Sequence, residues 1–578
     1  MRELMLGNKA VARGLYEGGC RVISSYPGTP STEITEEAAL YEDIYCEWAP
    51  NEKVALEAAH GASLGGARSA CAMKHVGLNV AADPLFTISY QGVNAGLVIC
   101  VADDPGMHSS QNEQDSRHYA QAAKVPMLEP ADSGEALLFA RRAFELSEEY
   151  NTPVLLKLCT RVSHSQSVVE TGERVNPPER PYKKDPSRVM MTVNSRNAHV
   201  RVEQRTRDLR EYAENCDLNR VEMGDTALGI ITSSVSYQYA REVFGQEASV
   251  LKLGMVHPLP EKLIRDFAAK CQRVVVLEEL DPIIENHCRQ LGIEVSGKDI
   301  FPICGEFSQN LVRSSMGLPV PETMKIEDEI PGRPPVMCAG CPHRGVFYVL
   351  HKKNCMVYGD IGCYTLGALA PLHAMDLNVC MGASCSGLHG FNIAQGVQGE
   401  ERSVGVIGDS TFIHSGITGI TDIAYNGTNS TVIILDNSIT GMTGHQQNPT
   451  TGRNLRGEPA GKVDLEALCR ALGYERVRVV DPYDLAEVER ILEEELAARA
   501  PSIIISRRPC VMLKGTVHGA PLEVNRDKCA GCGACMKIGC PAISLRDGKA
   551  KIDPTLCIGC KVCTQMCRLG ALAEQGVS

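Results

Sequence analysis

The feature that most constrains this 578-residue sequence is the distribution of its 25 cysteines. Eight of them lie in residues 529–578, in a run C-A-G-C-G-A-C-M-K-I-G-C followed by a run C-I-G-C-K-V-C-T-Q-M-C. Both runs open with the spacing C-x2-C-x2-C, which brings three thiolates around one four-iron cluster while the fourth cysteine of the run binds the other cluster. The sequence therefore predicts two 4Fe–4S clusters near its C-terminus.

The two runs predict two crossed sets of ligands. The first cluster is expected to bind Cys529, Cys532, Cys535 and Cys567, and the second Cys557, Cys560, Cys563 and Cys540. Residues 520–578 resemble a bacterial two-cluster ferredoxin domain, although the first run has one extra residue before its last cysteine and Arg568 stands where the second proline usually falls. Zinc is the alternative, because C-x2-C pairs also bind zinc, but eight cysteines without a histidine favour iron.

Composition and charge exclude several classes of protein. The N-terminal stretch M-R-E-L-M-L-G-N-K-A-V-A-R-G does not resemble a signal peptide, and no run approaches the roughly 18 apolar residues of a membrane span. We therefore expect a cytoplasmic protein without membrane contact, in which clustered cysteines bind metal instead of forming disulfides. With 58 Lys and Arg against 70 Asp and Glu, the net charge is −12. This balance and the mixed charges of residues 180–220 argue against a nucleic-acid partner.

Short apolar strands alternate with helices through most of the chain. Runs without polar alternation are typical of parallel sheets covered on both faces, and they occur at residues 96–102, 153–158, 228–233, 249–254, 273–279, 403–408, 431–436, 475–480 and 502–506. We predict a multidomain α/β protein with domains at 1–165, 225–315 and 333–512, followed by the Cys-rich domain at 520–578. The charged, proline-containing residues 166–224 are expected to form a linker.

Polar residues follow two neighbouring predicted strands in the region 333–512. Gly408, Asp409 and Ser410 end one strand, and Asn437 follows the next. At the carboxyl ends of parallel strands, such oxygen ligands can hold a hard cation that bridges to a phosphate. Gly-Asp and Asp-Asn pairs also occur in ordinary turns, so this pattern alone leaves both interpretations open.

The same residues resemble the thiamine-diphosphate motif, in which Gly-Asp-Gly is followed by Asn one strand–helix–strand unit later. M-G-A-S-C-S-G-L-H-G (381–390) is similar to the helix start before that motif, and T-G-M-T-G-H-Q (440–446) to a loop of the 2-oxoacid:ferredoxin oxidoreductases. The resemblance implies thiamine diphosphate and Mg²⁺, although Ser410 and His445 replace glycines of that family. By this resemblance the magnesium ligands are Asp409, Asn437 and the backbone carbonyl of Ile439. Cofactor contacts are expected from Gly408, Asp409, Ser410, Asn437, Ile439, Thr440 and His343.

Region 1–165 is expected to supply the acid that activates the cofactor. Glu52 begins a predicted helix, N-E-K-V-A-L-E-A-A-H-G-A-S, and its spacing to the following Gly-Ala pair resembles that of the activating glutamate in the same oxidoreductases. A carboxyl group buried against the aminopyrimidine ring has the shifted proton affinity that this step needs. The alternatives are a first-turn glutamate favoured by the helix dipole, and Glu57 one turn later.

Two further residues are candidates for substrate binding. S-Y-P-G-T-P-S-T-E (25–33) resembles the substrate loop of the same family, which implies that Thr29 contacts a 2-oxoacid. Arg117, in N-E-Q-D-S-R-H-Y, is a candidate for holding the substrate carboxylate.

Four other cysteines have the order of a third iron–sulfur site. Cys338 and Cys341 form a C-x2-C pair, Cys363 follows in D-I-G-C, and Cys510 in S-R-R-P-C. In related oxidoreductases cysteines in this order ligate a cluster next to thiamine diphosphate. Buried free thiols are the alternative, since cysteine is among the most often buried residues.

The whole order of motifs is similar to the family of indolepyruvate:ferredoxin oxidoreductase α subunits. The resemblance implies oxidative decarboxylation of arylpyruvates such as indolepyruvate, with coenzyme A, to aryl-acetyl-CoA, CO₂ and reduced ferredoxin. It also implies an external ferredoxin and a smaller β subunit as partners, in a heterodimer or a pair of αβ units. One alternative is an oxidoreductase of the same family that acts on another 2-oxoacid. A second is a non-redox thiamine-dependent decarboxylase, which the ferredoxin-like tail disfavours. A third is an electron-transfer subunit with an inactive thiamine site, which Glu52, Asp409 and Asn437 disfavour.

Overall fold

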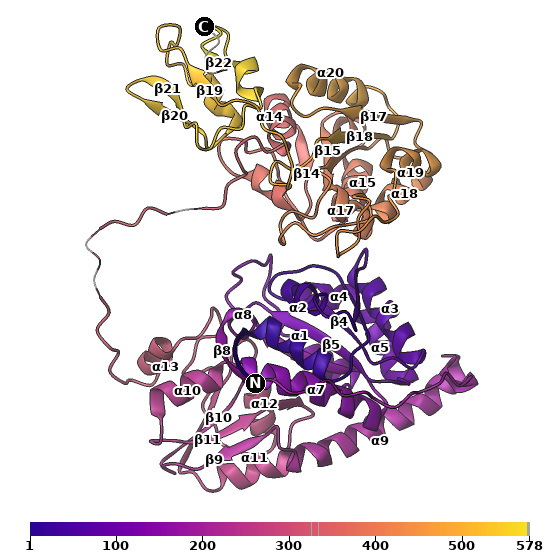
Figure 1. Ribbon diagram of the computed structural model, residues 1–578, viewed down its shortest axis with the longest axis vertical. Helices are drawn as coiled ribbons and strands as arrows, with labels where there is room; N and C mark the ends of the chain where they lie inside the picture. Colours follow the sequence, from indigo (N-terminus) through magenta and orange to yellow (C-terminus); the bar gives the residue numbers. More distant parts are fainter. Residues whose placement is uncertain (325, 327, 333, 575–578) are drawn as a thin grey trace. The chain divides into compact units, whose positions relative to one another are not determined.

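The computed structural model describes residues 1–574 except 325, 327 and 333. The chain forms two compact units, Met1–Glu327 and Asp328–Ser578, which run from indigo to magenta and from salmon to yellow in Figure 1. Each unit contains its own parallel sheet and its own hydrophobic core. The predicted α/β class with parallel sheets is confirmed.

The largest sheet of the first unit has seven strands in the order β12-β6-β7-β5-β4-β2-β3. All neighbouring pairs are parallel except β12 with β6. β4, β5 and β7 are buried along their whole length, as their continuous apolar sequences predict. The strands are β2 (Val22–Ser25), β3 (Tyr45–Trp48), β4 (Ser69–Lys74), β5 (Leu97–Asp103), β6 (Met127–Leu128), β7 (Val154–Cys159) and β12 (Met255–His257).

Helices pack on this sheet and begin where the sequence supplies capping groups. Asn51 and Asp132 each accept a hydrogen bond from a backbone amide in the first turn, at the starts of α3 and α7. Gly14 lets α1 and α7 approach closely, since a methyl group there would lie 2.3 Å from the Leu137 carbonyl oxygen. The helices are α1 (Gly7–Glu17), α2 (Thr32–Ala38), α3 (Glu52–Leu64), α4 (His75–Val80), α5 (Ala82–Gln91), α6 (Arg117–Ala123), α7 (Ser133–Tyr150) and α8 (Thr160–His164).

The segment 166–224, which we predicted to be a linker, is built into two sheets of this unit. β8 (Gln166–Glu170) pairs antiparallel with β1 (Arg2–Leu6), and β9 (Arg220–Glu222) pairs antiparallel with β11 (Ser249–Leu253). Between them lies the 24-residue helix α9 (Thr192–Asn215), which follows a short 3₁₀ turn, η1 (Pro186–Arg188). This helix was not predicted because its sequence is mostly polar and its apolar face is narrow. The residues that it buries are Ala198, Val202, Leu209 and Ala213.

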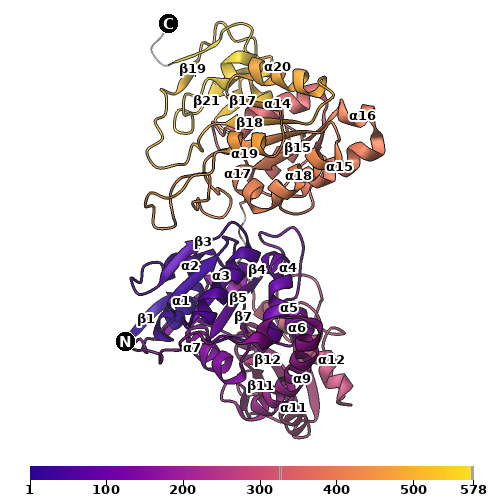
Figure 2. The same ribbon diagram turned by 90° about the vertical axis from the view of Figure 1, so that its right-hand side faces the viewer.

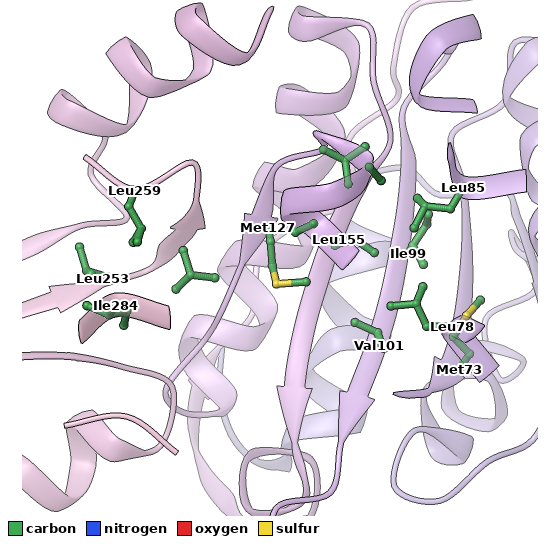
Figure 3. Packing of buried hydrophobic residues seen from close by; sticks show 14 of the residues in the cluster. Met73, Leu78, Leu85, Ile99, Val101, Met127, Leu155, Leu253, Leu259 and Ile284 are labelled. Carbon is green, nitrogen blue, oxygen red and sulfur yellow. The ribbon is translucent and has the colours of Figure 1, made fainter. Parts of the chain in front are cut away.

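A second sheet of the first unit has the order β13-β10-β11-β9. Its strands β10 (Leu228–Ser233), β11 (Ser249–Leu253) and β13 (Arg273–Leu277) match predicted strands. The core of the large sheet continues into this part, and Figure 3 shows Ile99, Met127 and Leu155 in one cluster with Leu253 and Ile284. The accompanying helices are α10 (Ser236–Phe244), α11 (Glu261–Ala268), α12 (Ile283–Gln290) and α13 (Gln309–Ser315).

The second unit is centred on a five-stranded, fully parallel sheet in the order β14-β15-β16-β18-β17. Its strands are β14 (Met356–Tyr358), β15 (Ser403–Gly408), β16 (Thr431–Asp436), β17 (Arg476–Val480) and β18 (Ser502–Arg507). Its α-helices are α14 (His343–Lys353), α15 (Ala383–Gln395), α16 (Val397–Glu400), α17 (Asp409–Thr411), α18 (Ile417–Asn426), α19 (Leu465–Ala471) and α20 (Leu485–Leu496). A 3₁₀ helix η2 (Cys363–Ala368) and a π-helical turn η3 (Phe412–Gly416) complete it.

The Cys-rich tail packs against this domain instead of forming a separate unit. Its hairpins and turns share one hydrophobic cluster with α14 and α20, and Figure 2 shows the yellow tail beside α20. The elements are β19 (Leu522–Val524), η4 (Ala534–Ile538), β20 (Ile543–Arg546), β21 (Lys549–Ile552), η5 (Val562–Met566) and β22 (Leu572–Glu574). Within the described residues, no helix has the length and apolar character to cross a membrane.

Candidate active site and iron–sulfur centres

Glu52 is the first residue of α3 and lies buried beside α4. Its side chain is only 5% exposed. A methyl group at Gly77 of α4 would lie 2.5 Å from Glu52 Oε1, so the observed position of the carboxylate requires glycine there. The competing candidate, Glu57, is exposed and forms an ion pair with Lys53. Burial therefore favours Glu52 over Glu57 as the activating acid.

The predicted substrate loop connects β2 to α2 at the same end of the sheet. Thr29 is partly exposed, while its neighbours are held by hydrogen bonds. Asn8 Nδ2 donates to the Pro30 carbonyl at 2.6 Å, and Ser31 Oγ donates to the Gly28 carbonyl at 2.8 Å. The loop is thus fixed on both sides of the one residue expected to contact substrate.

Lys74, which the sequence analysis missed, ends β4 beside this loop. A methyl group at Gly28 would lie 3.1 Å from Lys74 Cβ, and Lys74 Nζ donates to the Ser109 carbonyl at 2.6 Å. The residue is 7% exposed, and burial lowers the pKa of its ammonium group to about 8, against an opposing effect of Asp104. Among the described residues no carboxylate reaches ion-pair distance of it. The sequence feature that could have indicated Lys74 is a lysine at the end of the buried strand S-A-C-A-M-K.

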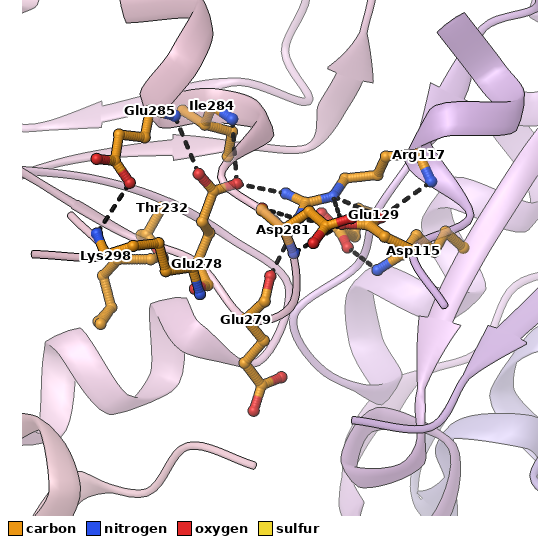
Figure 4. Close-up of polar contacts among 12 residues, drawn as sticks. Asp115, Arg117, Glu129, Thr232, Glu278, Glu279, Asp281, Ile284, Glu285 and Lys298 are labelled. Atoms are coloured by element: carbon orange, nitrogen blue, oxygen red, sulfur yellow. Dashed lines mark hydrogen bonds and ion pairs between the residues drawn. The ribbon is translucent and has the colours of Figure 1, made fainter. Parts of the chain in front are cut away.

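Arg117 lies elsewhere, in a buried network between the seven-stranded and the four-stranded sheet of the first unit. It is 1% exposed, and its guanidinium forms ion pairs at 2.6 Å with both Asp115 and Glu278. Nη2 also donates to the carbonyls of Glu279 and Asp281, as Figure 4 shows. A substrate carboxylate could engage this arginine only if these bonds were broken, so the observed contacts give Arg117 a role in joining the two sheets.

The residues predicted at the diphosphate converge at the carboxyl ends of β15 and β16. Asp409 is 2% exposed and accepts a hydrogen bond from Thr450 through Oδ2. Thr440 Oγ1 donates to Ser410 Oγ at 2.9 Å, the Ile439 amide donates to Asn437 Oδ1 at 3.3 Å, and Asn437 Nδ2 lies 3.5 Å from His343 Nε2. Gly408 is the last residue of β15. The structure thus brings together Gly408, Asp409, Ser410, Asn437, Ile439, Thr440 and His343.

The donor set at this edge fits a hard divalent cation. It offers a carboxylate, a side-chain amide oxygen and a backbone carbonyl, all oxygen ligands of the kind that Mg²⁺ takes. Burial raises the pKa of Asp409 to about 7, with a further contribution from nearby Asp436. Because burial disfavours the ionised form of Asp409, a positive charge beside it would stabilise that form.

Asp360 is a second buried acid that the sequence analysis missed. Its carboxylate accepts hydrogen bonds from the amides of Gly382 and Ser384, where α15 begins. Burial raises its pKa to about 6, while these amide donors act in the opposite direction. Because Gly382 adopts a φ of 89°, the acid fixes a left-handed turn directly before the helix that was predicted to precede the thiamine motif.

The four cysteines predicted for a third cluster lie together beside Asn437. Cys341 interacts electrostatically with Cys338 and Cys363, and Cys363 does so with Cys510. The Cys510 amide donates to the Asn437 carbonyl at 2.9 Å. These thiols therefore adjoin the predicted cation site, as a first electron acceptor would need to.

In the tail, cysteines of the two runs lie near one another. Cys535 interacts with Cys529, Cys532 and Cys567, and Cys563 interacts with Cys540, Cys557 and Cys560 and also with Cys535 of the other predicted set. No group of three or more His, Cys, Asp or Glu side chains in the described part of the chain is arranged around a single metal ion. A four-iron cluster holds its four thiolates farther apart than one ion does, and ligation by these sets stays a prediction.

Comparison with known proteins places three families along the chain. Residues 13–222 match pyruvate flavodoxin/ferredoxin oxidoreductase, thiamine diP-bdg, residues 360–506 match thiamine pyrophosphate enzyme, C-terminal TPP binding domain, and residues 550–573 match 4Fe-4S binding domain. A 2-oxoglutarate:ferredoxin oxidoreductase from Magnetococcus marinus aligns at 18% identity and a TM-score of 0.48, covering 55% of this chain and 65% of that chain. The family matches alone confirm the predicted thiamine diphosphate and iron–sulfur cofactors.

Two thiamine-binding domains followed by a 4Fe–4S domain define a thiamine-dependent 2-oxoacid oxidoreductase that passes electrons to iron–sulfur clusters. Indolepyruvate oxidoreductase subunit IorA of Methanothermobacter thermautotrophicus is 40% identical over 99% of this chain and 97% of its own length. The subunit of the same name from Pyrococcus abyssi is 39% identical over 99% and 97%. The chain belongs to the indolepyruvate oxidoreductase IorA family.

Proposed function

We propose that this protein is the α subunit of an enzyme that oxidatively decarboxylates arylpyruvates, indolepyruvate among them. In the proposed reaction coenzyme A takes the aryl-acetyl group, CO₂ leaves, and two electrons reduce an external ferredoxin. The observation that carries the proposal is the near-full-length identity to subunits named for indolepyruvate. The tail supports ferredoxin as the acceptor, because a 4Fe–4S domain ends the chain.

The residues of the first unit divide into two proposed roles. Glu52 would engage the aminopyrimidine ring of the cofactor with its carboxyl group, a role that its burial supports. Thr29 and Lys74 bind the 2-oxoacid, the threonine by hydrogen bonding and the lysine by placing a positive charge opposite the carboxylate. Lys74 takes over the role predicted for Arg117, since no carboxylate among the described residues lies within ion-pair distance of it and it lies beside the substrate loop.

The residues of the second unit are proposed to bind the diphosphate of the cofactor. Thiamine diphosphate, when bound, supplies the carbon nucleophile and the electron sink for decarboxylation. Asp409, Asn437 and the Ile439 carbonyl would hold Mg²⁺, which would neutralise the charge of the diphosphate. Thr440 and Ser410 orient this loop through their mutual hydrogen bond.

The cysteines define the proposed exit for electrons. The set Cys338, Cys341, Cys363 and Cys510 would hold the first acceptor, next to the cation site. The two tail sets would hold the clusters that lead to ferredoxin. We further propose a smaller β subunit as partner, in a heterodimer or a pair of αβ units, and a cytoplasmic location. The boundaries 1–165, 225–315, 333–512 and 520–578 stay our proposal for the domains.

The test is an anaerobic assay of the α subunit with its β partner, using indolepyruvate, coenzyme A and a viologen dye. Dye reduction should need thiamine diphosphate and the 2-oxoacid, and phenylpyruvate should replace indolepyruvate while 2-oxoglutarate should not. Glu52→Gln should abolish turnover and leave the iron content unchanged. Dye reduction without thiamine or 2-oxoacid, or an active Glu52→Gln variant, would contradict the proposal.

A further inference from the structure

Arg344 is a buried cation where the tail, residues 520–578, packs against the domain predicted at residues 333–512, which we call the diphosphate-binding domain. It lies in the first turn of α14, three residues after Cys341, and is 4% exposed. Its Nε donates to the Cys338 carbonyl at 3.0 Å, and its Nη1 donates to the carbonyls of Ile538 and Gly539, the latter at 2.5 Å. One guanidinium therefore joins the C-x2-C loop at 338–341 to the turn that precedes Cys540.

These hydrogen bonds satisfy the donors of Arg344 but leave its charge without a counter-charge. The guanidinium donates only to neutral backbone carbonyls in the described part of the chain, and no carboxylate there forms an ion pair with it. The acceptors are the carbonyls of Met337, Cys338, Ile538 and Gly539. A buried charge in that state is costly, and native proteins pair such charges with an opposite one. Arg117 of the first unit, also buried, illustrates the contrast, because it contacts two carboxylates.

The groups closest to Arg344 that can carry negative charge are thiols of two different sets. It interacts electrostatically with Cys338 and Cys341 of one set and with Cys540 and Cys560 of the other. Each set, holding a four-iron cluster with four thiolates, would carry a net charge of about −2 in the oxidised state. Arg344, which contacts both cysteine loops, would then stand next to both of these charges.

The local packing holds the two sets of thiols against each other. A cavity is lined by Cys341, Arg344 and the four cysteines of the second tail set, Cys540, Cys557, Cys560 and Cys563. A methyl group at Gly340 would lie 2.2 Å from Ile558, which stands between two of those cysteines in C-I-G-C, and the Tyr483 hydroxyl donates to the Gly340 carbonyl. The two cysteine loops are thus in direct contact.

We propose that Arg344 is the shared counter-ion of two iron–sulfur clusters, the tail cluster of Cys540, Cys557, Cys560 and Cys563 and the cluster of Cys338, Cys341, Cys363 and Cys510. As a positioning residue, it keeps these two clusters adjacent and raises the reduction potential of both. The inference rests on the proposed third cluster. The other tail cluster, that of the Cys529 set, lies outside its contacts.

The sign of the effect follows from charge. Reduction adds one negative charge to a cluster, so a nearby positive charge stabilises the reduced form and raises the potential. Replacing Arg344 by glutamine removes that charge while keeping a polar side chain. At a fixed solution potential, the ratio of reduced to oxidised cluster should fall about tenfold, which equals a shift of about −59 mV for one electron.

The experiment is a redox titration of the purified αβ complex, followed by electron paramagnetic resonance, with iron counted for each protein. The variants are Arg344→Gln, Arg344→Lys, which keeps the charge, and Arg490→Gln, which removes an equal charge from the exposed face of α20. We expect about twelve irons per chain at four per cluster. In Arg344→Gln two of the three potentials should fall, whereas Arg344→Lys and Arg490→Gln should retain the native values.

Each outcome decides the matter. Unchanged potentials in an iron-replete Arg344→Gln variant, a shift in one cluster only, or an equal shift in the lysine variant would overturn the proposal. Loss of iron from the glutamine variant alone supports the counter-ion role of Arg344. Loss of iron from both Arg344 variants would show that the hydrogen bonds of the guanidinium, and not its charge, hold the site together, and would overturn the proposal. About eight irons in the native protein would refute the third cluster, and with it the sharing, whatever the activity assay shows.

Discussion

The contact between Gly77 and Glu52 makes it possible to damage the active site without unfolding the protein. In Gly77→Ala the new methyl group would lie 2.5 Å from Glu52 Oε1, 2.7 Å from its Cγ and 2.9 Å from its Cδ. All three atoms belong to one side chain, so the overlap can be relieved by rotating Glu52 and leaving the backbone in place.

The structural and catalytic effects of that rotation should differ widely. A side chain forced about 30° from its rotamer costs roughly 0.5–1.5 kcal/mol, and 1 kcal/mol lowers the Tm of a unit this large by about 2–4 °C. A displacement of about 1 Å in a group that must meet its partner in the reaction can lower the rate about 100-fold. We therefore expect a kcat about 100-fold below native with a Tm only a few degrees lower.

The assay is viologen reduction with indolepyruvate and coenzyme A, alongside thermal unfolding followed by circular dichroism. Gly61→Ala is the matched control, because Gly61 lies in the same helix as Glu52 and a methyl group there would meet nothing within 4 Å. This control should keep its activity and gain about 0.5–1 kcal/mol from the better helix propensity of alanine. Native kcat in Gly77→Ala, together with an inactive Glu52→Gln, would refute the reasoning.

Three more outcomes follow from charges and thiols. The ammonium group of Lys74 has a pKa of about 8 and loses its charge above that pH. The KM for indolepyruvate should therefore rise as the pH passes from 7 to 9, and Lys74→Met should have a high KM at every pH. A native KM that does not change with pH would contradict the proposed contact with the substrate carboxylate. Arg117→Met should lower the free energy of unfolding in urea by about 3–5 kcal/mol, since it leaves Asp115 and Glu278 buried and unpaired; a change under 1 kcal/mol would count against the network. Cys510→Ser should lower the iron content from about twelve to about eight per chain at four irons per cluster, and full retention of iron would remove Cys510 from the ligand set.

Much of the fold could be predicted because its signals are local. Strands such as β5 and β16 are continuous apolar runs, and the positions of Asp409 and Asn437 follow from the rule that parallel strands end at one edge of a sheet. The cysteine sets are equally local, since C-x2-C-x2-C fixes three ligands in seven residues.

The residues that were missed or given another role depend on contacts between distant parts of the chain. Arg117 was a candidate for holding the substrate carboxylate, yet Glu278, 161 residues later, forms a buried ion pair with it. Lys74 has no motif, and only the fold places it beside Gly28. The segment 166–224 looked like a linker because its polarity dominates, whereas its helix α9 buries four apolar residues against the rest of the unit.

The hydrophobic cluster shared by the tail and the diphosphate-binding domain links oxidative damage of the iron–sulfur clusters to unfolding of the protein. Ile538, Ile543 and Leu572 of the tail pack in the same cluster as Val346 and Leu350 of α14. If the tail clusters hold these turns in shape, their oxidative loss would expose that apolar surface, because metal binding and folding are coupled in small metal-stabilised domains. Exposure to air would then unfold this part of the chain and release α14, whose first residue His343 lies beside Asn437 of the predicted cofactor site. Adding iron back would therefore restore activity only after refolding.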